Sequence, residues 1–202
     1  MEIDRGITRY DVMPIPPVEA HTERFEVGPI SIGVEYRLLD DAITAAFNAN
    51  NSSQPDFNDR GVSLHVFGTT GNEELEYLRF DCFDEDPHYH YVSYARRTNE
   101  MVHLDPAAHG DSLEWALDCI RTRLPQMLER AGGGELASQV ELARVEAILP
   151  KVAETAYRAR FGHDDEAIRS AAVAEATANP SMPATSDAPD APEAVQLSGD
   201  RT

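Results

Sequence analysis

Two histidines and an aspartate in the stretch "LRFDCFDEDPHYHY" (residues 78–91) have the types and spacing of metal ligands. His88 and His90 are one residue apart, so on a strand both imidazoles project from the same face, with Cα atoms about 6.5–7 Å apart. Two imidazoles this close can reach one divalent ion, and a carboxylate such as Asp81 completes an arrangement that open metal sites use. The spacing therefore predicts a metal site or, without a metal, an acid–base pair of Asp81 and His90.

Strand alternation decides which side chains can join these three. Leu78, Phe80 and Cys82 alternate with Arg79 and Asp81, which predicts an apolar face and a polar face. With a turn over residues 84–87, Asp81 is expected opposite His90. The same alternation in the preceding strand defines the polar face, whose expected members are Ser63, His65, Arg79, Asp81, His88 and His90.

Three further histidines are candidate ligands. His65 is expected on the polar face, and His103 and His109 lie in "HLDPAAHGD", where either could supply a ligand or a general base. The competing interpretation is that this H-x-H pair only decorates the solvated side of an amphipathic strand or forms a local hydrogen-bond network, because short motifs occur often without a function. The sequence leaves open whether the polar face meets water or lines a pocket.

The elements that must position these residues form an α+β pattern. Apolar residues alternate over residues 24–39, 61–83, 88–95 and 100–105, and the short connections predict an antiparallel β-meander. From Asp111 onward the apolar spacing changes to three and four, which indicates helices over residues 111–134 and 135–162. Pro125 and Pro150 are expected to kink or split them. The fold class predicted is an antiparallel sheet with C-terminal helices packed on one face.

The chain divides into three parts. Prolines in residues 1–22 favour an extended N-terminal arm. Residues 23–162 form the single α+β domain. Residues 163–202 are an acidic segment rich in Ala and Pro that is expected to be largely disordered, because few large apolar side chains are available to offset the entropy of ordering. Its alanine-rich beginning could extend the preceding helix.

The composition limits the partners. A net charge of −19 disfavours nucleic acid and anionic lipid surfaces, so we expect a protein partner or a homo-oligomer. The two cysteines, Cys82 and Cys119, form no C-x-x-C motif and are expected to be free thiols. The start of the chain has no signal-peptide pattern and no apolar run approaches the length of a membrane span. These features favour a cytoplasmic protein.

No nucleotide-binding, hydrolase or metalloprotease motif appears in the chain. The composition therefore favours a small acidic protein without catalytic activity, acting as an accessory subunit or binding module. The alternative is a divalent-metal-binding protein or metal-dependent enzyme that uses the H-x-H strand. Beyond that possible divalent metal the sequence indicates no cofactor, and it assigns no catalytic residue.

Overall fold

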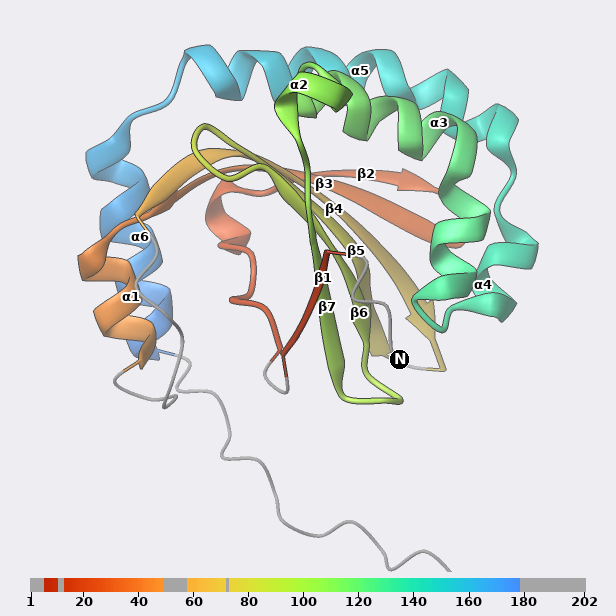
Figure 1. Cartoon of the computed structure of the whole chain (residues 1–202), viewed down its shortest axis with the longest axis horizontal. Coiled ribbons are helices and arrows are strands. Elements are labelled where there is room, and N and C mark those ends of the chain that lie inside the picture. The colour runs from red at the N-terminus through yellow and green to blue at the C-terminus, as the bar shows by residue number, and fades with distance from the viewer. Residues whose placement is uncertain (1–5, 11–12, 49–57, 72, 179–202) are drawn as a thin grey trace, which may run out of the picture.

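The structure is a computed structural model that describes residues 6–10, 13–48, 58–71 and 73–178. Within these residues an antiparallel sheet has the strand order β1-β7-β6-β5-β4-β3-β2, so the predicted meander is confirmed from β2 to β7 (Figure 1). The strands are Ile7–Tyr10 (β1), Glu23–Val27 (β2), Ile30–Leu39 (β3), Asp59–Thr70 (β4), Glu73–Phe83 (β5), His88–Ser93 (β6) and Thr98–His103 (β7).

The helices within residues 112–161 cover one face of this sheet, as predicted, and the helices of residues 41–48 and 165–178 pack together at its end beside β3 (Figure 1). The longest two pack against the apolar face, where Leu64 and Phe80 meet Ile120 and Val152 in one buried core. No helix in the described ranges is both long and apolar enough to span a membrane. The helices are Asp41–Asn48 (α1), Pro106–His109 (α2), Ser112–Arg130 (α3), Gly134–Gln139 (α4), Leu142–Phe161 (α5) and Asp165–Ala178 (α6), with a 3-10 turn at Glu19–His21 (η1).

The prolines do not break the helices where the sequence suggested. Pro125 lies inside α3 and Pro150 inside α5, and both helices continue through them. The break falls instead at Val140, which has an extended backbone and separates α4 from α5. A proline removes one backbone hydrogen bond, and in these two helices buried residues on both sides of each proline fix the ends against the sheet.

The N-terminal arm lies on the face of the sheet opposite α3 and α5. Its strand β1 pairs with β7 at the sheet edge, and the following segment crosses the concave side (Figure 1). Arg37 donates two hydrogen bonds of 3.2 Å to the carbonyl of Ile15. Glu35 accepts a bond of 2.9 Å from the amide of Val18. These contacts hold the arm over the polar face.

Residues assigned to the tail by composition include α6. This helix packs against α1 and β3, and Ile168 is buried in the common core. The alanine-rich segment therefore belongs to the packed structure. The disorder expected for residues 179–202 concerns residues outside the described part of the chain.

The register between β5 and β6 differs from the predicted one. Asp81 lies opposite His88 and Arg79 opposite His90, two residues away from the expected pairing of Asp81 with His90. The connecting loop is not a self-contained hairpin, because the carboxylate of Asp59 accepts from two of its amides, Glu85 N at 3.1 Å and Asp86 N at 2.8 Å. A shift of two residues leaves every side chain on its predicted face.

Candidate metal centre

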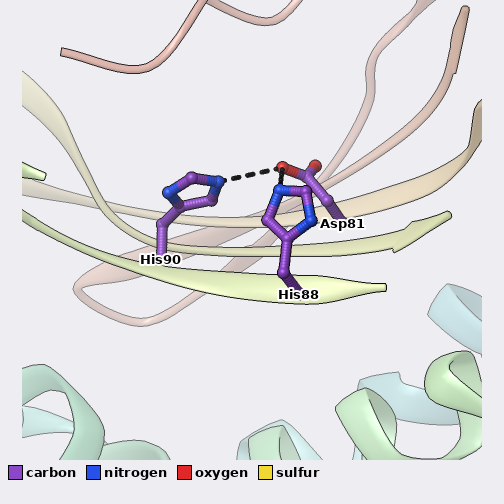
Figure 2. A group of neighbouring side chains, drawn as sticks. All are labelled: Asp81, His88 and His90. Carbon is purple, nitrogen blue, oxygen red and sulfur yellow. Dashed lines mark ion pairs between the residues drawn. The ribbon is translucent and has the colours of Figure 1, made fainter. Parts of the chain in front are cut away.

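Asp81, His88 and His90 come together on the polar face. One ligand atom from each lies within 4.8 Å of the others. The Nε2 atoms of both imidazoles point at the same carboxylate oxygen, Asp81 Oδ2, at 3.4 Å for His88 and 3.2 Å for His90 (Figure 2). The pleat of β5 and the neighbouring β6 places all three side chains on the side away from the helices.

This cluster is buried rather than solvated. Asp81 is 4 % exposed, and His88 and His90 are each 6 % exposed. Ser63 on β4, which lies directly opposite Asp81, donates a short hydrogen bond to the other carboxylate oxygen, Oδ1. The interpretation of this H-x-H strand as a solvent-facing surface is therefore wrong, whereas its other form, a local hydrogen-bond network, agrees with these contacts.

Each imidazole is oriented by a hydrogen bond at its other nitrogen. His88 Nδ1 lies 2.6 Å from the carbonyl oxygen of Asp86, and His90 Nδ1 lies 2.7 Å from Asn99 Oδ1. A carbonyl oxygen can only accept, so Nδ1 carries the proton in each ring. When the rings are neutral, their Nε2 lone pairs face Asp81, and hydrogen bonds at Nδ1 are the outer pattern that accompanies metal-ligating histidines.

The charges in the cluster are strongly coupled. Burial alone would raise the pKa of Asp81, but hydrogen bonds with both histidines and the charge of Arg79 hold it well below its usual range. Burial would lower the pKa of His88, but Asp81 and the carbonyl and carboxylate of Asp86 raise it. Burial lowers the pKa of His90, and Asp81 offsets only part of that effect. The two rings, with centroids 5.0 Å apart, therefore favour one shared positive charge over two.

The separations match the distances between ligands around one small cation. Donor atoms about 2.0–2.1 Å from a tetrahedral Zn²⁺ lie roughly 3.3 Å from each other. The two Asp81–imidazole separations, 3.4 and 3.2 Å, bracket that value. Two imidazoles and one carboxylate form a ligand set that leaves coordination positions open.

His65 belongs to a neighbouring ion network, not to this cluster. Its Nδ1 lies 2.6 Å from Glu76 and its Nε2 3.2 Å from Glu35, and Arg79 donates to Glu76 through Nε at 2.9 Å and Nη2 at 2.7 Å. Burial would raise the pKa values of both glutamates, but the charges of Arg37 beside Glu35, of Arg79 beside Glu76 and of His65 hold both below their usual range. Burial would lower the pKa of His65, and the two carboxylates raise it.

A β-bulge explains why Glu76 reaches the polar face. The register between β4 and β5 shifts between Val66 and Phe67, so Val66 pairs with Leu78 and Phe67 with Glu76, leaving Tyr77 unpaired. The extra residue reverses the alternation, so Tyr77 joins the core and Glu76 faces His65. Strand alternation without a bulge assigns Glu76 to the apolar face, so it could not be predicted as part of this network from the sequence.

The other candidates lie outside the cluster. His103 is close to His88, with ring centroids 6.0 Å apart, but it is partly exposed and pairs through Nδ1 with Asp86 at 2.8 Å. His109 lies on α2, where it bonds the backbone of Asp105 and contacts the ring of Trp115. Trp115 packs on Phe80 and Tyr89 of the apolar face, so His109 is on the opposite side of the sheet.

The cluster opens into a cavity of about 50 Å³ between the sheet and the arm. Two arginines of the sheet line it beside the cluster, and the arm closes it. Glu35 and Arg37 could have been placed here from the sequence, because they alternate with apolar residues in "GVEYRLL". No comparable pattern in the sequence predicts that the arm closes the cavity. The cavity is lined by Tyr10, Pro14, Ile15, Arg37, Leu39, Arg79, Asp81, His88, His90, Asn99 and Met101.

The fold and the site define an α+β protein with a buried cluster of two histidines and one aspartate on the concave face of its sheet. The chain belongs to the family described as a domain of unknown function (DUF7700), whose model matches residues 24–156. The matched segment includes all three residues of the cluster. No curated protein and no solved structure matches the chain.

Proposed function

We propose that the protein binds one divalent transition-metal ion through His88, His90 and Asp81. The observation that carries the proposal is the convergence of both imidazole Nε2 atoms on one carboxylate oxygen, at 3.4 and 3.2 Å. With both Nδ1 protons directed at acceptors, three electron-pair donors face one another at this point. A metal cation between them satisfies all three, whereas without it one ring must take up a proton at Nε2 and donate it to Asp81.

The chemistry available to such an ion follows from the ligand count. Three protein ligands leave at least one coordination position for a small molecule, as in catalytic zinc sites and in two-histidine, one-carboxylate iron sites. The role of accessory subunit or binding module stays a prediction that rests on composition and charge, and a metal-binding protein is compatible with it.

The test is metal content together with thermal stability. Protein purified without a His-tag and dialysed against Zn²⁺ should bind one ion per chain. At a free Zn²⁺ concentration of 100 times Kd, binding should add about 2.7 kcal/mol of stability, which is about 5–11 °C in Tm for a chain of this size.

Two alanine substitutions provide the matched comparison. His90→Ala should abolish stoichiometric zinc and the rise in Tm, whereas His109→Ala, the same change on the far side of the sheet, should keep both. The proposal fails if wild-type protein shows neither bound zinc nor a zinc-dependent Tm, or if His90→Ala binds zinc as tightly as His109→Ala does.

A further inference from the structure

Arg79 has an unused hydrogen-bond donor beside the cluster. The side chain is 2 % exposed, and Nε and Nη2 donate to Glu76. Nη1 has no hydrogen-bond partner among the described residues. Among these residues, Asp165 Oδ1 is the one side-chain nitrogen or oxygen that is both fully enclosed and without a partner, so Nη1 is not fully enclosed. Arg79 is one of the residues that line the cavity of the cluster. A buried guanidinium with a free donor is a site for an anion.

The charge on this face points to the same class of ligand. Three buried carboxylates, Glu35, Glu76 and Asp81, face two buried guanidiniums, Arg37 and Arg79. With a divalent cation in the cluster, the cation and the two guanidiniums carry four positive charges and the carboxylates carry three negative ones, even with every histidine neutral. An uncompensated charge in a buried site is costly. An anion entering with the cation restores the balance.

The walls of the cavity select the kind of anion. The charged end is formed by Arg79 and the three residues of the cluster. The remaining walls combine four apolar residues, Pro14, Ile15, Leu39 and Met101, with Tyr10, Arg37 and Asn99. A second cavity of about 90 Å³ adjoins it and shares Ile15, Arg37 and Leu39; its lining is mostly apolar, with Glu35, Arg37 and Glu175 as its charged members. A carboxylate with a short hydrocarbon chain fits both ends of this site, whereas a phosphate would leave its further oxygens against apolar walls.

We propose that the cavity binds a short-chain monocarboxylate, with one carboxylate oxygen on the metal ion and the other accepting a hydrogen bond from Arg79 Nη1. The proposal deepens the proposed function and rests on it, since the cation supplies half of the anion's contacts. Arg79 lies opposite His90 in the register of β5 and β6, two residues from Asp81 on the same face, and it lines the cavity together with the cluster. The hydrocarbon chain lies against Leu39 and Met101.

Calorimetric titration of the zinc-loaded protein with acetate, butyrate and inorganic phosphate tests this. Butyrate should bind more tightly than acetate, by up to about fourfold for each of its two additional CH₂ groups, and both should bind more tightly than phosphate. The metal-free protein should bind butyrate at least about tenfold more weakly. In Co²⁺-loaded protein, butyrate should shift the visible absorption bands because it enters the coordination shell.

Two variants separate the contributions. Arg79→Lys should weaken butyrate binding at least about tenfold, and Arg121→Lys on the exposed face of α3 should leave it unchanged. If Arg79→Lys does not fold, Leu39→Phe provides the test, because the larger ring should fill the cavity and weaken butyrate equally while zinc remains bound.

Zinc binding without butyrate binding overturns this inference and leaves the proposed function standing, whereas absence of zinc binding overturns both. Phosphate binding more tightly than butyrate refutes the assignment to a carboxylate. Equal butyrate affinity in wild type and in Leu39→Phe refutes the assignment to this cavity.

Discussion

Glu76 offers the sharpest test of the buried network, because the β-bulge alone places it there. Its carboxylate accepts two hydrogen bonds from Arg79, at 2.9 and 2.7 Å, and lies 2.6 Å from His65 Nδ1. In Glu76→Gln the side chain keeps its shape but loses its charge, and its NH₂ group is placed against an arginine donor. Removing one partner from a buried ion pair costs about 3–5 kcal/mol.

The assay is urea or thermal unfolding followed by circular dichroism. The expected loss corresponds to roughly 6–20 °C in Tm for a chain of this size. Glu73→Gln is the matched control, because it makes the same change at the exposed start of β5 and should alter stability by no more than about 0.5 kcal/mol. A Glu76→Gln protein within about 1 kcal/mol of Glu73→Gln would refute the argument that this network stabilises the fold.

The pH dependence of the unfolding free energy provides an independent test whose direction can be predicted. Burial alone would raise the pKa of Glu76, but Arg79 and His65 hold it well below its unfolded value of 4.5. A carboxyl group with a lowered folded pKa contributes its full stability above the unfolded pKa and loses that contribution as the pH falls through the folded pKa. The difference in unfolding free energy between wild type and Glu76→Gln should therefore shrink as the pH falls below 4.5. Because Glu76 also raises the pKa of His65, the difference should shrink again as the pH rises above 6.5.

Two further predictions follow from close backbone contacts. Gly61→Ala should lower the unfolding free energy measured by chemical denaturation by at least about 2 kcal/mol, because a Cβ there would lie 2.5 Å from the Cys82 carbonyl oxygen and 2.8 Å from Phe83 Cα. Gly134→Ala is the control and should be near neutral, because its Cβ meets open space. Equal stabilities of the two variants would contradict the β4–β5 register. Arg37→Gln should release the carbonyl of Ile15 and loosen the arm, so the Val18 amide, which donates to Glu35, should exchange its hydrogen faster. Unchanged protection of Val18, with β3 still protected, would mean that Arg37 does not anchor the arm.

The site could be predicted from the sequence as far as local rules extend. Strand alternation placed Asp81, His88 and His90 together with Ser63 and His65 on the face opposite Phe80, and the structure has all of them there. That result survives the incorrect turn assignment because an even shift of register preserves the face. Strand alternation does not determine which side chains on that face contact one another, since His65 pairs with Glu35 and Glu76 and not with Asp81.

The sequence by itself determined the antiparallel sheet, the helices on its apolar face and the parity of the H-x-H strand, because side-chain period and turn chemistry are properties of neighbouring residues. Only the tertiary structure decided that the polar face is buried, that a bulge brings Glu76 to Arg79, and that α3 and α5 run through their prolines. Each of these depends on segments far apart in the chain. The arm contacts Glu35 and Arg37 through backbone groups, which every residue carries, and so leaves no pattern in the sequence.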